Sequence, residues 1–197
     1  MASADSNLLR IVDQAMAEAF SRSSGALRCA KGCFGCCIGP FPINTMDAAR
    51  LRRGLLALPP QTAATIQNRA AEAIAAMLPQ YPGHPQSGIL YRDRADELFS
   101  HPALKGIPCP ALDLESGACT LYEFRPIACR TYGPAITLEG RPMPHCQLNY
   151  RTYTAEQVEA CRVAVDAGLA GPAAAAEFEA CGHAIEQTTI AFALRSA

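Results

Sequence analysis

The cysteines are the residues of this chain with the clearest chemical potential, because eight of the ten fall into two groups. The first group has the spacing Cys-x3-Cys-x2-Cys-Cys and consists of Cys29, Cys33, Cys36 and Cys37. The second group is more widely spaced and consists of Cys109, Cys119, Cys129 and Cys146. Converging thiolates repel one another, and a bound metal cation relieves that repulsion. The pattern therefore predicts a metal site that holds zinc or an iron–sulfur cluster through these eight thiols.

The adjacent pair Cys36–Cys37 bears on how the thiols are shared. We expect neighbouring side chains to point apart, so these two are not expected to bind one zinc ion together. One of them would then ligate a second site or remain a thiol. Eight thiols suffice for two tetrathiolate sites, or for one cluster with spare redox thiols. The sequence leaves both arrangements open, although the adjacent pair favours a site shared between the two groups.

Basic residues near the cysteines are candidates to balance the charge of such a site. A tetrathiolate zinc site carries a charge of about -2, as does an oxidised four-iron cluster with four cysteines. Arg28 and Lys31 lie beside the first group, and Arg125 and Arg130 flank Cys129. We predict that Arg125 and Arg130 contribute to cofactor binding, while Arg28 and Lys31 are equally well explained as surface cations.

Other candidate residues have plainer interpretations. His145 precedes Cys146 and is a candidate metal ligand, although a solvent-exposed loop histidine is the more ordinary role. Glu123 is placed to anchor Arg125 or Arg130, or to cap a helix. Cys161 and Cys181 lie outside the two groups, on predicted helices, and we expect both to pack as small buried side chains. No residue is predicted to act as a catalytic acid, base or nucleophile.

The elements that must position the cysteines are predicted to be mainly helical. Apolar residues recur at helical spacing over residues 7–22, and further helices are expected over 45–58, with Thr45 as the cap, and from Pro60 to Met77. Turn signals at Glu115–Gly117 and Glu139–Gly140 predict two small hairpins, joined by a helical turn at Glu123–Cys129.

Two more helices are expected near the end of the chain, at 154–167, after a capping box, and at 172–194. The fold class is therefore mainly α: a single helical domain over residues 1–197, with two irregular cysteine-bearing segments and small β-hairpins around a metal site. The motif core spans 29–146, and the C-terminal helices span 154–194.

Composition restricts the partners. Half of the residues are hydrophobic, so a core can form without metal, and the net charge of -1 provides no electrostatic attraction for nucleic acid or an anionic membrane. We expect no signal peptide, since the N-terminus lacks a basic region followed by an apolar stretch, and no apolar segment approaches the roughly 20 residues of a membrane helix. A cytoplasmic location follows as the expectation. Thiols stay reduced there, which favours metal ligands over disulfides. A protein partner remains open.

Taken together, the motifs resemble a known family. Cys-x3-Cys-x2-Cys-Cys, followed by Cys-Pro-x-Leu and Gly-x-Cys-x-Leu-Tyr-Glu-x-Arg-Pro-x-x-Cys-Arg-x-Tyr-Gly, is similar to the YkgJ-type cysteine-cluster family over about residues 29–146. The resemblance implies a zinc- or iron-chelating domain. Because that family includes flagellin lysine N-methylases, it also implies an alternative, an iron–sulfur-dependent enzyme or accessory related to protein lysine N-methylation. A third hypothesis is a thiol redox sensor that uses a pair such as Cys36–Cys37.

Overall fold

The computed structural model describes residues 3–196, and contacts along the chain divide it into two compact units. Unit 1 combines the residues up to Ala30 with Ile127–His183, and unit 2 combines Lys31–Pro126 with the residues from Ala184 onward. The chain is 49% helical and its strands are short, which confirms the predicted mainly α class. Each unit is discontinuous in sequence, so segments far apart along the chain build each one.

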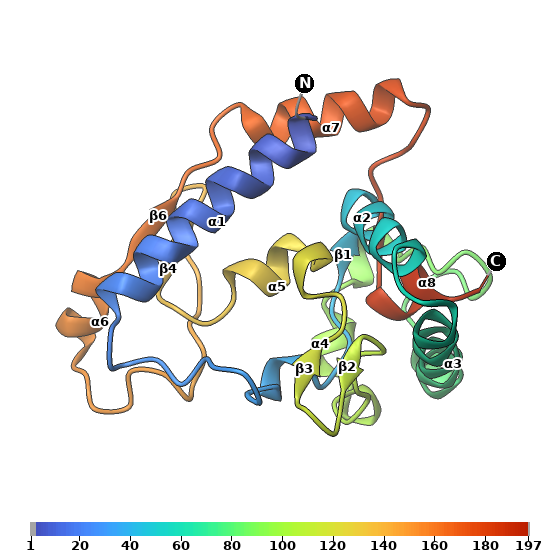
Figure 1. The fold of residues 1–197 in the computed structure, drawn as a ribbon, viewed down its shortest axis with the longest axis horizontal. Helices are drawn as coiled ribbons and strands as arrows, with labels where there is room; N and C mark the ends of the chain where they lie inside the picture. The colour runs from blue at the N-terminus through green and yellow to red at the C-terminus, as the bar shows by residue number, and fades with distance from the viewer. Residues whose placement is uncertain (1–2, 197) are drawn as a thin grey trace. The chain divides into compact units, whose positions relative to one another are not determined.

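The long helix α1 (Ala4–Arg22) organises unit 1. Ser3 caps it by accepting a hydrogen bond from the backbone N–H of Ser6, so the helix begins earlier than the apolar periodicity predicted. Its buried stripe consists of Leu8, Val12, Met16 and Ala19. Helix α1 contacts α5 (Ile127–Thr131), β6 (Val163–Val165) and α7 (Ala170–Ala180), and Figure 1 shows α7 beside the N-terminal end of α1.

A three-stranded sheet completes unit 1, with strand order β5-β4-β6. Strands β4 (Ile136–Leu138) and β5 (Arg141–Pro142) form an antiparallel hairpin around the predicted turn at Glu139–Gly140. The third strand, β6, pairs parallel to β4, with Ile136 opposite Val163 and Leu138 opposite Val165. Consequently the helix predicted over 154–167 is wrong in its second half. Helix α6 (Ala155–Cys161) stops before the β-branched valines, which are buried as a strand.

The helix predicted over 172–194 is also wrong as a single element. Helix α7 begins two residues before Pro172 and ends at Ala180, and Gly182 then adopts a positive φ of 82°. The rest of that stretch belongs to unit 2, where it forms β7 (Gln187–Thr188) and α8 (Ile190–Leu194). Strand pairing with residues 43–44 of the same unit outweighs the helical preference of this alanine-rich sequence.

Unit 2 is built on α2 (Thr45–Leu56) and α3 (Pro60–Met77), which both pack against the fully buried α8. The red segment of Figure 1 between α2 and α3 is α8. The cap of α2 is Asn44, whose side chain accepts from the backbone N–H of Asp47 at 2.7 Å. The prediction of Thr45 as the cap was therefore wrong, because the Thr45 hydroxyl instead donates to the carbonyl of Ala184 at 2.6 Å.

The remaining elements of unit 2 are short. Its helical segments are η1 (Gly35–Cys37), η2 (Leu78–Gln80), η3 (Arg92–Arg94), α4 (Glu97–Ser100), η4 (Pro102–Leu104) and η5 (Tyr122–Phe124). Strand β1 (Ile43–Asn44) pairs with β7, and β2 (Leu112–Asp113) pairs with β3 (Ala118–Cys119). The β2–β3 hairpin closes around the predicted turn at Glu115–Gly117, so both predicted hairpins are present.

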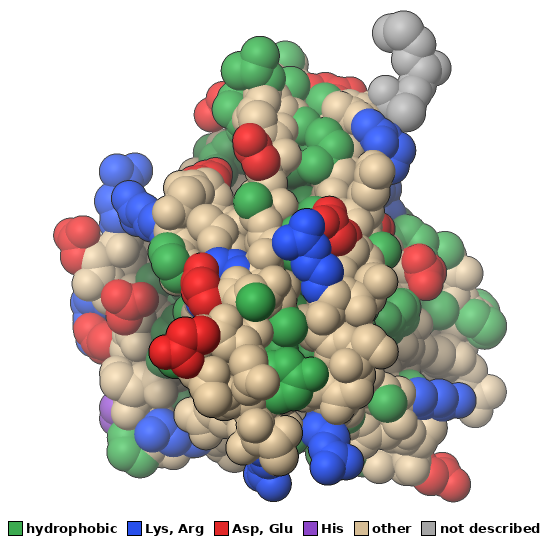
Figure 2. Space-filling view, turned by 90° about the vertical axis from the view of Figure 1, so that its left-hand side faces the viewer, with side chains coloured by type: hydrophobic (Ala, Val, Ile, Leu, Met, Phe, Trp, Pro, Cys, Tyr) green, Lys and Arg blue, Asp and Glu red, His purple; other side chains and the backbone are tan. Residues whose placement is uncertain are grey.

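The surface carries charges of both signs. On the face that Figure 2 presents, Lys and Arg side chains are interspersed with Asp and Glu, and apolar side chains lie between them. Within residues 3–196, none of the helices combines the length and the apolar character needed to cross a membrane.

Candidate metal centre

The eight clustered cysteines are divided between the two units. Unit 2 holds Cys33, Cys36, Cys37, Cys109 and Cys119, and unit 1 holds Cys29, Cys129 and Cys146. Cys33 and Cys36 are exposed, whereas the other six are half-buried.

Backbone pairing joins the two sequence groups within unit 2. The N–H of Cys109 donates to the carbonyl of Cys37 at 2.8 Å, and the N–H of Gly39 donates to the carbonyl of Ile107 at 2.7 Å. Between these two bonds, Ile38 and Pro108 form an antiparallel bridge. The loop of the first group and the entrance to the β2–β3 hairpin are thus held side by side without any help from the thiols themselves.

Cys36 and Cys37 lie in the 3₁₀ turn η1, and their side chains are hydrogen-bonded to each other. This corrects the expectation that the adjacent side chains point apart. That expectation suits an extended backbone, whereas a 3₁₀ turn rotates successive side chains by only about 120°. The hydrogen bond from Cys37 lowers the pKa of Cys36 to about 6. Partial burial opposes this shift, and a backbone hydrogen bond adds to it.

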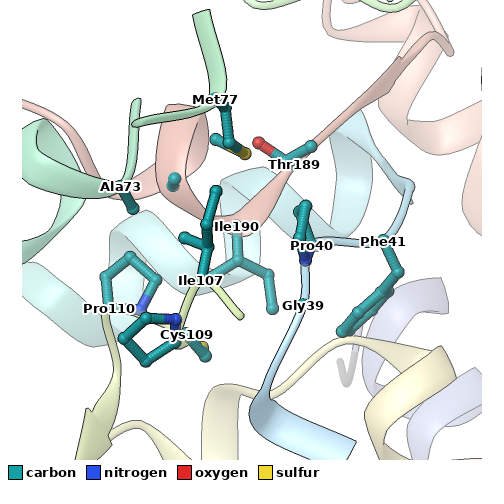
Figure 3. A pocket seen from close by; sticks show the side chains of 12 residues that line it. Gly39, Pro40, Phe41, Ala73, Met77, Ile107, Cys109, Pro110, Thr189 and Ile190 are labelled. Atoms are coloured by element: carbon teal, nitrogen blue, oxygen red, sulfur yellow. The ribbon is translucent and has the colours of Figure 1, made fainter. Parts of the chain in front are cut away.

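Cys109 has the opposite electrostatic environment. Burial raises the pKa of the Cys109 thiol to about 12, and the neighbouring Cys119 and Cys36 raise it further, while backbone hydrogen bonds oppose the shift. Figure 3 shows the reason for the burial, since Cys109 lies beside apolar side chains such as Ile107 and Pro110 at a small pocket of unit 2. The charges of Cys119 and Cys36 thus act on the Cys109 thiol.

Arg125 supplies positive charge close to Cys119 in unit 2. Burial raises the pKa of Cys119, which sits opposite Leu112 in the β2–β3 hairpin, and the charge of Arg125 acts against that rise. The guanidinium of Arg125 lies over the ring of Tyr122, 3.6 Å from its centroid. Arg125 is therefore suitably placed to compensate a thiolate at Cys119.

The hairpin turn also approaches the first cysteine loop closely. Gly117 has a positive φ of 65°, and a Cβ at this position would lie 2.8 Å from the Cα of Gly32. Only glycine allows this approach between the hairpin and the backbone four residues before Cys36.

In unit 1, Cys29 is surrounded by Gly133 and Asn149. The Asn149 side-chain amide donates to the Cys29 sulfur at 3.5 Å and to the carbonyl of Gly133 at 2.8 Å. The same carbonyl accepts from the N–H of Cys146 at 3.0 Å, so the backbone that carries Cys146 is fixed to the residue that contacts Cys29. Cys129 lies on α5, which packs against α1.

The second predicted arginine contacts a carboxylate. The buried Arg130 guanidinium donates to both oxygens of Asp13, at 2.7 and 2.8 Å, which ties α5 to α1. This ion pair gives Arg130 a structural role in unit 1. Its predicted contribution to cofactor binding remains a prediction.

Cys161, Cys181 and His145 are the other residues that the sequence singled out. Cys161 is buried in a cluster with Ala26, Ala135 and Tyr150, as predicted. Cys181 is exposed, which contradicts the prediction of a packing role, because α7 ends just before it. The ring of His145 lies edge-to-face against Tyr150, with centroids 5.0 Å apart.

Sequence reasoning missed Asn149, although a signal existed: a polar amide three residues after Cys146, within the span of the motif. Gly133 belongs to the sequence motif, and the structure explains why a glycine is needed at this position. A Cβ at residue 133 would lie 3.0 Å from the Cys29 sulfur, and the backbone φ is 131°.

The donor set fits a thiophilic metal. Thiolates suit zinc and iron–sulfur clusters, the charges of Cys36 and Cys119 act on Cys109 in unit 2, and Arg125 offers compensating charge. Within residues 3–196, however, no three or more Cys, His, Asp or Glu side chains are grouped tightly enough to form a ready-made ion site.

The chain is a cysteine-cluster protein, because most of its cysteines lie on loops and short elements of a mainly helical fold. The family model CxxCxxCC, described as "Putative zinc- or iron-chelating domain", matches residues 28–162, and the chain belongs to this family. The match extends past Cys146 and includes Asn149 and α6. Comparisons with curated proteins and with solved structures found no match.

Proposed function

We propose that this protein is a cytoplasmic metal-binding protein that holds an iron–sulfur cluster or zinc through its eight clustered cysteines. The observation that carries the proposal is the backbone pairing of Cys37 with Cys109 in unit 2, inside the span of the chelating family. This pairing brings together two cysteine-bearing segments that lie about 70 residues apart in sequence. Packing does not account for the exposed Cys36 beside it.

Within unit 2, the interacting thiols are the first candidates to hold the metal. Cys36 and Cys37 form a hydrogen-bonded pair, and the charges of Cys36 and Cys119 act on the Cys109 thiol. The metal would supply the positive charge that lets the buried Cys109 ionise, which burial opposes in the metal-free protein. Cys33 is a further predicted ligand in unit 2, and Cys29, Cys129 and Cys146 are the predicted ligands in unit 1.

Between the two metals we favour iron–sulfur, because eight clustered thiols exceed the four that one structural zinc requires. Anaerobic purification followed by an absorption spectrum and elemental analysis of one sample tests this choice. Broad visible absorption with iron and sulfide in equal amounts supports the cluster. A colourless protein with stoichiometric zinc rejects the cluster and supports the zinc form.

The ligand assignment is tested by substitution. Replacing Cys37 and Cys109 together by serine should abolish metal retention, because it removes the two cysteines at the backbone junction. Replacing Cys161 and Cys181 together by serine is the matched control, since neither belongs to the two groups, and should leave the metal content unchanged. Equal metal content in both double variants, measured by elemental analysis, contradicts the assignment.

A thiol redox sensor is the second candidate, and the Cys36–Cys37 hydrogen bond favours it. A low pKa and an exposed position are typical of reactive thiols. Peroxide would oxidise Cys36 to a sulfenic acid, and attack by the Cys37 thiol would then form a disulfide and release water. Mass spectrometry of peroxide-treated protein tests this step. A 36–37 disulfide that forms in metal-loaded protein supports the sensor, and protection of both thiols by metal argues against it.

A further inference from the structure

The side chain of Asn149 is buried, with only 3% of the residue exposed, and every polar atom it carries is in use. Its oxygen accepts from the backbone N–H of Arg28 at 2.8 Å, and its nitrogen donates to the carbonyl of Gly133 at 2.8 Å. These two bonds fix the orientation of the amide, since exchanging its oxygen and nitrogen would set acceptor against acceptor and donor against donor. The nitrogen that points to Cys29 is therefore a true donor.

The sulfur of Cys29 lies within reach of both ends of this amide. It is 3.5 Å from the Asn149 nitrogen and 3.9 Å from the Asn149 oxygen. A thiolate accepts from the nitrogen, and a neutral thiol has a weak acceptor available in the oxygen. The amide is thus complementary to Cys29 with and without the proton, which a purely apolar neighbour would not be.

Backbone bonds make the surroundings of this sulfur rigid. The carbonyl of Gly133 also accepts from the N–H of Cys146, and the N–H of Asn149 in turn donates to the carbonyl of Cys146 at 2.9 Å. One residue further, the N–H of Tyr150 donates to the carbonyl of Ala26 at 2.9 Å. Segments that are more than 100 residues apart are thereby locked around Cys29 within unit 1.

We propose that Asn149 is a positioning residue that holds the sulfur of Cys29 as a metal donor and donates an N–H to it once the thiolate binds metal. This inference rests on the proposed metal-binding function. Hydrogen bonds to ligating groups orient them and tune the metal, and their loss typically lowers metal affinity about 10–100-fold. In an iron–sulfur protein, hydrogen bonds to the sulfurs also set the reduction potential.

The test is a double-mutant cycle with Co²⁺ as the probe, read from the thiolate-to-cobalt absorption bands. Asn149→Ala should weaken Co²⁺ binding by about 10–100-fold in the wild-type background. In a Cys29→Ser background the same substitution should change the affinity by less than about threefold, because Asn149 acts through Cys29. An exposed control, Asn68→Ala on α3, should leave the affinity unchanged.

The outcomes separate this inference from the function on which it rests. Equal weakening by Asn149→Ala in both backgrounds, or none in either, overturns the positioning role while leaving metal binding intact. A wild-type protein that yields no cobalt–thiolate bands contradicts the positioning role and the zinc form of the proposed function, whereas the iron–sulfur form is judged by the absorption spectrum and elemental analysis described above.

A second variant guards against simple misfolding. Asn149→Asp keeps an oxygen for the N–H of Arg28 but sets an acceptor against both the Cys29 sulfur and the Gly133 carbonyl. Compared with the wild type at a matching far-ultraviolet circular dichroism spectrum, it should bind Co²⁺ more weakly. Unchanged or tighter binding in this variant also overturns the proposal.

Discussion

The two units hold their cysteines by different means. In unit 1, a side-chain amide and a close-fitting glycine fix the sulfur of Cys29 itself. In unit 2, backbone pairing at Cys37 and Cys109 aligns the segments, and the thiols then influence one another directly. In unit 1 the contacts fix the position of one sulfur atom. In unit 2 the hydrogen bonds fix the backbone of two segments and not the thiols that they carry. Thiols of the second kind are the ones whose ionisation should depend most on a bound metal.

The ion pairs of the two units differ in burial, which yields the largest predicted effect. Asp47 and Arg50 of α2 are both buried in unit 2, whereas Asp13, the partner of Arg130 in unit 1, is half exposed. Asp47→Asn should destabilise the protein by about 3–5 kcal/mol, because it removes the negative charge from a buried ion pair with Arg50. Asp13→Asn should cost only about 1–2 kcal/mol, since water reaches that site. Urea unfolding measures both, and equal losses would contradict the difference in burial.

Thiol reactivity in unit 2 should show the next largest contrast. At pH 7, a pKa of about 6 makes Cys36 mostly thiolate, while a pKa of about 12 leaves Cys109 almost wholly protonated. The lower intrinsic nucleophilicity of the more acidic thiol offsets part of this difference, so metal-free Cys36 should be alkylated roughly a hundredfold faster. Peptide mapping after iodoacetamide treatment measures the rates, and similar rates would refute the two environments.

The same two shifts predict how pH affects stability. The lowered pKa of Cys36 stabilises the folded state fully above about pH 9, and this contribution is lost as the pH falls to about 6. The raised pKa of Cys109 acts in the opposite direction. Its contribution is complete below about pH 9 and is lost as the pH rises to about 12. Unfolding of the Cys36→Ser and Cys109→Ser variants across these ranges should remove each dependence separately.

Two glycines, each with a positive φ that disfavours other residues, allow the crowding in the two units to be compared. Gly117→Ala should destabilise unit 2 by about 2–3 kcal/mol, because its Cβ would meet the backbone of Gly32. Gly133→Ala should cost about 3 kcal/mol, because its φ of 131° is nearly closed to residues with a Cβ and the new Cβ would lie 3.0 Å from the Cys29 sulfur, which Asn149 holds. Gly140→Ala, at a positive φ in open space, supplies the baseline of about 1 kcal/mol in the same thermal unfolding experiment.

The helix caps should show the smallest effects. Asn44 caps α2 in unit 2, and Thr154 forms a capping box with Gln157 at the start of α6 in unit 1. Replacing either by alanine should cost about 1 kcal/mol, because one backbone N–H loses its partner. A much larger loss for Asn44→Ala would show that this cap also holds the adjoining β1–β7 pair.

Local sequence signals determined much of this protein. The cysteine spacing identified the family, apolar periodicity and prolines located α1 and α3, and glycine-containing turns located both hairpins. Each of these signals is encoded within a few neighbouring residues, so no distant contact was needed to interpret it.

Only the tertiary structure decided the rest. Val163–Val165 forms a strand because it pairs with Ile136–Leu138. Thr45 does not cap α2, because its hydroxyl donates a hydrogen bond to the carbonyl of Ala184. The convergence of Cys36 with Cys37, the burial of Cys109, and the amide of Asn149 at the sulfur of Cys29 likewise depend on the backbone turn or on residues distant in sequence. Hydrogen bonding and desolvation act through space, so their effects emerge only where folding brings these groups together.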